Sequence, residues 1–365
     1  MEAILGLDIG RSGIKAAEIV TNKNERRLEN LFHYEFPIDI ITKGTPEEKE
    51  AARENALKEI FAKMIVDSEV SISLAYEDIV MERLSLAVAP KDEIASMVKW
   101  ELTDKLTYPV DEAQVDYVVL GKRDELGTER LNVLAFSVWR NKALKIVSDI
   151  EKFGVKVVNL QPPNLGVTHL LNLQSLIKED EVIGVFDLGA EQFSFYIIYE
   201  GNVQFYHNVS VNGNIITKSI ADYCSMSFDE AEKAKRRVGL VAVEKVSDGG
   251  GYSFINPTDK QIAYTVNSQL EKLINEVERS FKYFSFKLTL SQIKKMNRIF
   301  VLGGGANLRG LTDFIATRLY VPVEVLNPFK GLVYVIQRFD SEYLKKVSPL
   351  MANSIGACLV MSEVG

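Results

Sequence analysis

Cysteine, histidine and tryptophan are scarce in this chain. Only Cys224 and Cys358 occur in 365 residues, together with three histidines and two tryptophans. Two cysteines are too few for a disulfide framework or a cysteine-based zinc site, which favours a reducing cytoplasm. His33, His169 and His207 lack the spacing typical of metal ligands, so we interpret them as structural residues.

The chain also lacks an excess of positive charge and any long hydrophobic run. Its formal net charge is −7 and its pI is about 5.3, so neither nucleic acid nor an anionic membrane surface is expected as the main partner. No apolar run approaches the roughly 20 residues that cross a bilayer. An acidic Glu2 and a predicted strand from Ile4 argue against a signal peptide or an anchor. We therefore expect no direct membrane insertion.

The most informative stretch lies near the N-terminus, where an apolar strand ends at Asp8 and enters a glycine-flanked turn. Gly10 and Gly13 permit a tight turn in which backbone N–H groups and the Ser12 hydroxyl face an anion. Lys15 follows the turn and adds a positive charge. A single Asp-x-Gly turn is weak evidence, because most such turns are ordinary hairpins.

The same pattern returns about half a chain length later, at Asp187 and Gly189. Each copy is followed by two further strand-like segments rich in Phe, Tyr, Ile and Val. These segments are 13–20 and 28–37 after the first copy, and 193–199 and 202–211 after the second. Since self-similarity identifies an architecture where a single motif does not, the sequence predicts two related halves.

A third turn lies near the C-terminus, after a predicted buried strand at 298–302. Gly303, Gly304 and Gly305 form this turn, and a helix is predicted from Leu308. A backbone without side chains can lie flat against a nucleoside.

These three turns, in this order, resemble the phosphate 1, phosphate 2 and adenosine loops of the actin-like ATPase superfamily. Within it the chain resembles the PilM family of type IV pilus assembly, from Leu5 to about Gly356. Supporting stretches are 94–121, 231–235 and 321–329. The resemblance implies an α/β, actin-like (ribonuclease H-like, duplicated) two-domain fold with an inserted small α/β subdomain.

The resemblance also implies a domain plan. The expected parts are domain I at 1–37 and 114–180, the inserted subdomain at 38–113, domain II at 181–239 and 297–365, and a small subdomain of domain II at 240–296. The insert begins with a predicted helix after Thr45 and resembles a subdomain that PilM shares with FtsA, so it is a candidate peptide-binding element; alternatively, its apolar face is core. The segment 349–364 is expected to pack as a short helix on domain II.

The site residues follow from the resemblance as well. It implies an ATP and Mg²⁺ site in which Asp8 and Asp187 contact the hydrated metal and act with Gln161, which orients the attacking water. The nucleotide-binding residues are expected to be Gly10, Arg11, Ser12, Gly13, Lys15, Gly189, Gly213, Glu232, Lys235, Gly303, Gly304 and Gly305. For Gln161 a role as a plain helix start stays open, and for Glu232 and Lys235 a role on a surface helix.

Both phosphate loops depart from the PilM pattern. Arg11 and Gly13 stand where the family usually has serines, and Glu191 follows the second turn where small or hydroxyl residues are usual. A carboxylate beside the phosphates repels them, so we expect weak or absent hydrolysis. In the fold that the resemblance implies, the two loops face each other across the cleft, so Arg11 and Glu191 either pair or both point to solvent.

The resemblance finally implies a partner and a place. We expect a cytoplasmic scaffold, peripheral at the inner membrane, that binds the N-terminal tail of a PilN-like membrane protein; contacts with pilus motor components and self-association stay open. The alternatives are a GspL-like component of type II secretion, which requires a transmembrane helix, a divisome-type actin homologue, and a small-molecule kinase, for which no catalytic base is recognisable.

Overall fold

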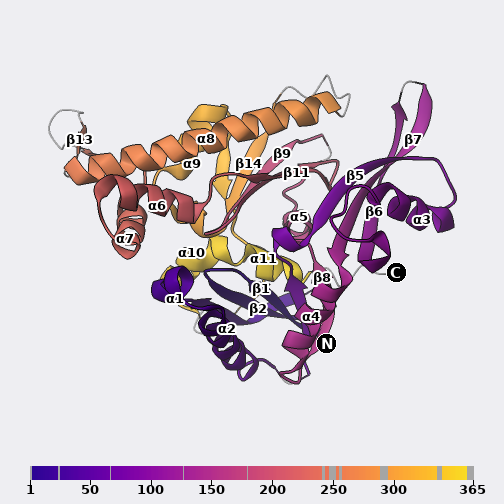
Figure 1. Ribbon diagram of the computed structural model, residues 1–365, viewed down its shortest axis with the longest axis horizontal. Helices are drawn as coiled ribbons and strands as arrows, with labels where there is room; N and C mark the ends of the chain where they lie inside the picture. Colours follow the sequence, from indigo (N-terminus) through magenta and orange to yellow (C-terminus); the bar gives the residue numbers. More distant parts are fainter. Residues whose placement is uncertain are drawn as a thin grey trace.

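Three β-sheets organise the chain in a computed structural model (Figure 1). The structure describes residues 2–23, 25–65, 67–125, 127–178, 180–240, 243–245, 252–254, 257–287, 295–334 and 339–359. Parts of the expected small subdomain at 240–296 therefore lie outside the described residues; within it, β12 (Val243–Lys245) and β13 (Tyr252–Phe254) form a two-stranded sheet.

The first five-stranded sheet begins at the N-terminus. Its strands, in spatial order, are β3 (Glu25–Glu35), β2 (Gly13–Asn22), β1 (Glu2–Ile9), β4 (Glu69–Ser73) and β8 (Lys156–Gln161). The first three run antiparallel, whereas β4 and β8 run parallel to β1. Helices α1 (Ile38–Lys43) and α2 (Pro46–Phe61) form the crossover that a parallel strand requires, and Leu57 and Ile60 of α2 pack on the sheet. The predicted capping box at Thr45 begins α2.

The second five-stranded sheet repeats this topology. Its strands, in spatial order, are β11 (Asn202–Val209), β10 (Phe193–Tyr199), β9 (Ile183–Leu188), β14 (Arg298–Leu302) and β15 (Val323–Val325). Again three antiparallel strands are followed by two parallel ones. The predicted duplication and the actin-like two-domain α/β fold are confirmed.

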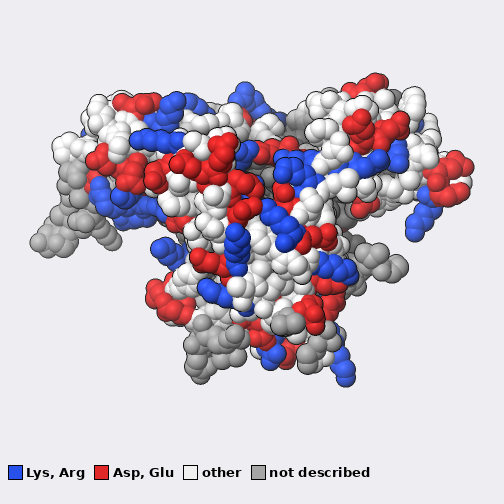
Figure 2. Space-filling model, turned by 60° about the horizontal axis from the view of Figure 1, so that its bottom comes forward, with Lys and Arg blue, Asp and Glu red and all other residues white. Residues whose placement is uncertain are grey.

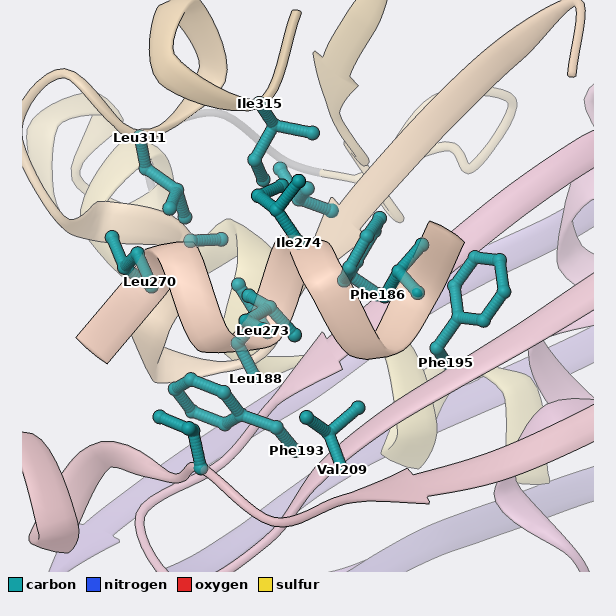
Figure 3. Packing of buried hydrophobic residues seen from close by; sticks show 14 of the residues in the cluster. Phe186, Leu188, Phe193, Phe195, Val209, Leu270, Leu273, Ile274, Leu311 and Ile315 are labelled. Atoms are coloured by element: carbon teal, nitrogen blue, oxygen red, sulfur yellow. The ribbon is translucent and has the colours of Figure 1, made fainter. Parts of the chain in front are cut away.

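Helices cover the outer face of the second sheet. They are α6 (Gly213–Cys224), α7 (Phe228–Val238), α8 (Pro257–Lys287) and α9 (Leu311–Leu319). Figure 3 shows Leu270, Leu273 and Ile274 of α8 among Phe186 and Phe193 of the sheet, and all five side chains are buried. Their burial removes apolar surface from water and fixes the long helix α8 across the strands.

Two further helices lie between the five-stranded sheets: α5 (Pro163–Leu173) and α11 (Ala352–Ala357), which follows α10 (Ser341–Val347). The main chains approach closely, because a Cβ atom on Gly6 of β1 would lie 1.9 Å from the carbonyl oxygen of Ser354. The expectation that 349–364 packs on domain II needs correction: α11 packs against α5, β1, β2 and β4 and shares a core with both sheets. Residues from 360 onward lie outside the described part.

The third sheet consists of β5 (Val80–Ala87), β7 (Thr128–Trp139) and β6 (Ala113–Glu125), in that order, with α3 (Lys91–Leu102) packed on it. It projects from the body of the molecule, and α4 (Arg140–Glu151) returns the chain to β8 (Figure 1).

The expected insert at 38–113 therefore needs correction. Residues 38–73 belong to the first sheet and its crossover helices, because Leu57 and Ile60 of α2 pack beside Val70 of β4 and Leu5 of β1. Strands β6 and β7, expected in domain I, pair with β5 instead. The separate α/β unit runs from about residue 80 to 139.

Acidic and basic side chains are interspersed over the face shown in Figure 2, without a continuous basic area. Within the described ranges, no helix has both the length and the apolar character needed to cross a membrane.

Candidate functional site

A cavity of about 1030 Å³ lies where the two Asp-x-Gly turns and the triple-glycine turn meet. Its lining includes twelve of the expected site residues: Asp8, Arg11, Ser12, Lys15, Asp187, Gly189, Gly213, Glu232, Lys235, Gly303, Gly304 and Gly305. Gly10, Gly13 and Gln161 do not line it. The three turns converge because β1, β9 and β14 end at the same place between the two halves of the fold.

The first turn holds a carboxylate and an amine close together. Asp8 ends β1 opposite Lys15 of β2, and the Lys15 Nζ lies 3.6 Å from the Asp8 Oδ2. The expectation that backbone N–H groups of this turn face an anion needs correction for Gly10. The Gly10 N–H donates to the carbonyl oxygen of Gly13 at 3.0 Å, so this donor is used inside the turn. Gly13 is required by close packing, since a Cβ atom there would lie 2.2 Å from the carbonyl oxygen of Tyr34.

The carboxylate of the second turn forms no salt bridge among the described residues, although Lys15 of the first turn is near enough to lower its pKa. Asp187 ends β9 and is 9% exposed, and the Asn353 Nδ2 donates to its Oδ2 at 2.9 Å. Burial raises the pKa of Asp187 to about 6, and the nearby Asp8 adds to this, while the Asn353 hydrogen bond opposes it. A divalent cation between the two carboxylates would remove their repulsion, so this pair fits a metal site.

The three glycines of the third turn differ in what surrounds them. Gly303 has a φ of +81°, and a Cβ atom there would lie 2.7 Å from the carbonyl oxygen of Leu188. A Cβ atom on Gly305 would meet the Leu188 side chain at 2.7 Å, whereas one on Gly304 would meet nothing within 4 Å. Gly303 and Gly305 thus allow the turn to pack on β9, and Gly304 leaves open space.

A polar network forms the wall opposite the carboxylates. The Lys235 Nζ lies 2.7 Å from the Glu232 Oε2 and donates to the Thr217 hydroxyl at 2.7 Å and to the Gly213 carbonyl oxygen at 3.0 Å. Burial opposes ionisation of Glu232, but Lys235 and the hydrogen bonds from Thr217 and Arg236 hold its pKa below the ordinary value. Glu232 and Lys235 are therefore part of the cavity wall and not of an outward surface.

Two ion pairs cross the cleft between the halves. Arg11 of the first turn lies 3.5 Å (Nε) from Glu191 of the second, and 2.5 Å (Nη2) from Glu77. Arg236 of α7 lies 2.5 Å from Glu35 at the end of β3. Arg11 and Glu191 pair as in one of the two expected arrangements, but their side chains are 56% and 41% exposed, and the shorter contact of Arg11 is the one with Glu77.

Gln161 departs from its expected place. It is 3% exposed at the end of β8, and its carbonyl oxygen accepts from the Leu74 N–H. Strand β4 lies between β1 and β8, so Ser73 occupies the position beside Asp8, and Gln161 lies one strand further away. Sequence reasoning missed Ser73 and Asn353; the row of residues that end parallel strands is the signal that identifies Ser73.

A sequence model of the family described as type IV pilus assembly protein PilM matches residues 6–246, and one of cell division protein FtsA matches residues 185–354. Cell division protein FtsA of Buchnera aphidicola (subspecies Acyrthosiphon pisum) is 27% identical over 213 residues, which are 53% of this chain and 49% of that protein. The match thus spans about half the length of that relative.

Solved structures have the same fold. A PilM-PilN type IV pilus biogenesis complex contains a chain that is 23% identical, with a TM-score of 0.78 and coverage of 98% of this chain and 97% of that chain. MreB 5 of Spiroplasma citri bound to AMPPNP is 13% identical, with a TM-score of 0.54 and coverage of 98% and 95%.

Proposed function

Because the chain belongs to the PilM family of type IV pilus assembly proteins, we propose that it binds ATP and Mg²⁺ in this cavity and recruits the N-terminal tail of a PilN-like membrane protein. It would thereby act as a cytoplasmic scaffold at the inner membrane. One observation carries the nucleotide part: Asp8 and Asp187 face a shared cavity whose lining continues to the triple-glycine turn.

Each part of the cavity has a distinct task in this proposal. Asp8 and Asp187 hold the metal through its water ligands, and Lys15 binds a phosphate oxygen. When bound, Mg²⁺ neutralises charge on the phosphate oxygens. Glu232 and Lys235 lie on the ribose and base side, and Gly304 leaves room for the flat base.

The proposal includes slow or absent hydrolysis. Glu191 lines the cavity near the phosphate end, where its charge opposes that of the triphosphate. Gln161 does not line the cavity, so the proposal gives it no catalytic role. The chain would act mainly as a nucleotide-dependent scaffold.

Calorimetric titration of the full chain with ATP, with and without Mg²⁺, tests the site. The Asp187→Ala variant should lose the Mg²⁺-dependent part of binding, because one of the two carboxylates that hold the metal is gone. Asp222→Ala, an exposed position on α6 outside the cavity lining, is the matched control and should bind as the native chain does. An unchanged affinity of Asp187→Ala refutes the assignment.

The proposed binding of a PilN-like tail is supported by the likeness to the chain in the PilM-PilN complex and by exposed apolar side chains on the third sheet. Val118 and Val119 of the edge strand β6 are 37% and 43% exposed. We propose that this unit, with the adjoining first domain, captures the tail. A short peptide orders on binding, so micromolar affinity is expected.

Fluorescence anisotropy with a labelled synthetic peptide of the cognate PilN N-terminus measures this affinity. Val118→Asp should weaken binding, because a charge replaces apolar contact area. Tyr320→Asp is the control, since Tyr320 is 89% exposed on the second half. Equal binding by both variants and the native chain would place the tail elsewhere.

A further inference from the structure

Two buried hydroxyl groups in the cavity wall have no hydrogen-bond partner within the described part of the chain. They belong to Ser73, which is 4% exposed, and Tyr76, which is 7% exposed. Both residues line the cavity. A buried polar group without a partner costs stability. Ten such side-chain atoms occur in the described part of the chain, and four of them belong to residues that line the cavity: Arg53, Ser73, Tyr76 and Asn353. Two of them in one wall therefore point to a polar ligand.

The position of Ser73 connects it with the metal-binding carboxylates. Ser73 ends β4 and lies in register with Asp8 on the neighbouring strand β1. Side chains of parallel strands in register share a face of the sheet, so the Ser73 hydroxyl lies on the side of the Asp8 carboxylate. Asn353, which holds Asp187, likewise has an amide oxygen without a partner.

Tyr76 is held in place by its ring, while its hydroxyl has no partner. It lies in the 3₁₀ turn Tyr76–Asp78 between β4 and β5, and its ring stacks on Tyr206 of β11 with centroids 4.8 Å apart. The Tyr206 hydroxyl, in contrast, interacts with Gln192 and Asn208. Packing thus explains the Tyr76 ring and leaves its hydroxyl unexplained.

We propose that the hydroxyl groups of Ser73 and Tyr76 bind the terminal phosphate of a nucleoside triphosphate, so that this wall distinguishes the triphosphate from the diphosphate. The inference rests on the proposed nucleotide site and adds its specificity-determining residues. A phosphate oxygen accepts hydrogen bonds from both hydroxyl groups and satisfies them.

The electrostatic surroundings of Tyr76 agree with a donor role. Burial, together with Tyr196 and Asp187, raises the pKa of the Tyr76 hydroxyl well above its ordinary value. A tyrosine hydroxyl is protonated at neutral pH even without such a shift, so the donor is available in either case. A group that stays protonated beside two carboxylates can donate to an anion without adding negative charge.

The turn also links the cavity to the cleft and to the third sheet. Glu77, next to Tyr76, pairs with Arg11, and Asp78 lies 3.1 Å from the Lys142 Nζ of α4. Strand β5 begins two residues later. A contact between Tyr76 and the terminal phosphate would thus involve the segment that directly precedes the proposed tail-binding unit.

Calorimetric titrations with ADP and with AMP-PNP, both in Mg²⁺, test the inference on the full chain. The native chain should bind AMP-PNP more tightly than ADP. Tyr76→Phe, which keeps the ring, and Ser73→Ala should each lose about tenfold in AMP-PNP affinity while ADP affinity stays within about twofold, since only one charge-assisted hydrogen bond is removed. Tyr206→Phe is the control and should leave both affinities unchanged.

The outcomes separate this inference from the function on which it rests. If the native chain binds neither nucleotide, the proposed function fails, and the inference fails with it. If the native chain binds both nucleotides but neither variant changes the ratio of their affinities, the inference is overturned and the proposed function stands. A melting temperature of Tyr76→Phe at or above that of the native chain shows that lost affinity does not come from misfolding.

Discussion

The two Asp-x-Gly turns have the same backbone pattern but differ in the burial and hydrogen bonding of their carboxylates, while Lys15 acts on both. In each turn, the N–H of the glycine that follows the aspartate donates a hydrogen bond across the turn. The acceptor is the carbonyl oxygen of Gly13 in the first copy and that of Gln192 in the second. Yet Asp8 has Lys15 at 3.6 Å, whereas Asp187 is buried beside the amide of Asn353. The fold thus duplicates the geometry of the turns and not the surroundings of their carboxylates. We infer that the second carboxylate is the one that depends on a bound cation.

The largest effect that tests this contrast is on the free energy of unfolding. Since Asp187 has a pKa of about 6 when folded, against an ordinary value of 3.8, the folded state binds the proton more tightly. Stability should therefore fall as the pH rises from about 4 to 6, by roughly 3 kcal/mol in total. Asp187→Asn should remove most of this loss and stabilise the nucleotide-free chain at pH 7.

Asp8→Asn is the matched variant in the first turn. It removes a partner from Lys15, but it should change stability less than Asp187→Asn does, because the 3.6 Å separation is too long for a hydrogen bond and Lys15 keeps Asp187 as a nearby carboxylate. Urea unfolding of both variants at pH 4.5 and 7 measures the difference. Equal effects in the two turns would contradict the contrast.

An intermediate effect concerns the side chains that join the turns. Glu191→Thr removes a carboxylate whose repulsion of a phosphate charge 4 Å away is roughly 1 kcal/mol in water and about 4 kcal/mol at an effective dielectric of 20. Because Arg11 compensates part of this charge, we expect ATP affinity to rise about fivefold, or turnover to rise. Calorimetry and phosphate release measure these quantities.

Two results would count against this prediction. One is native hydrolysis at the rate of an ordinary actin-like ATPase with no improvement in Glu191→Thr. The other is an equal gain from Glu324→Thr, an exposed carboxylate on β15 that does not line the cavity and serves as the control for a change in overall charge.

The turns and the duplicated fold could be predicted from sequence because their signals are local. Asp8 and Asp187 each end an apolar strand, and the spacing to the next strands shows directly in the residues. The triple glycine likewise follows a strand of five residues without interruption. These features needed no knowledge of which strand lies beside which.

The remaining errors come from pairing between distant segments. Strand β4 has only five residues and joins β1 through the crossover helix α2, so its sheet could not be assigned from its own residues. That error also displaced the expected insert and left Ser73 unrecognised beside Asp8. Asn353 comes from the C-terminal helix α11, and no local pattern connects it with Asp187.

The smallest expected effect concerns the glycines that follow the two aspartates. A Cβ atom on Gly10 would meet the flexible end of Lys15 at 2.9 Å and the backbone carbonyl oxygen of Gly13 at 3.3 Å, whereas one on Gly189 would meet the backbone carbonyl oxygen of Gln192 at 2.8 Å. Gly10→Ala should therefore change the free energy of unfolding by less than about 0.5 kcal/mol, because the Lys15 amine can move. Gly189→Ala should cost about 1 to 2 kcal/mol, because the turn backbone has to shift.

Urea unfolding measures these losses of stability. Binding of the ATP analogue AMP-PNP then distinguishes the roles of the two turns. Displacing the Lys15 amine in Gly10→Ala should weaken binding of AMP-PNP more than it weakens the fold, since Lys15 is proposed to bind a phosphate oxygen. Gly189→Ala should lower the stability of the fold more than it lowers the affinity for AMP-PNP. The two variants could instead lose equal amounts of unfolding free energy and of AMP-PNP affinity. The backbone surroundings of the two turns would then be energetically equivalent. In that case, the difference between the two carboxylates has to arise from Asn353 and burial alone.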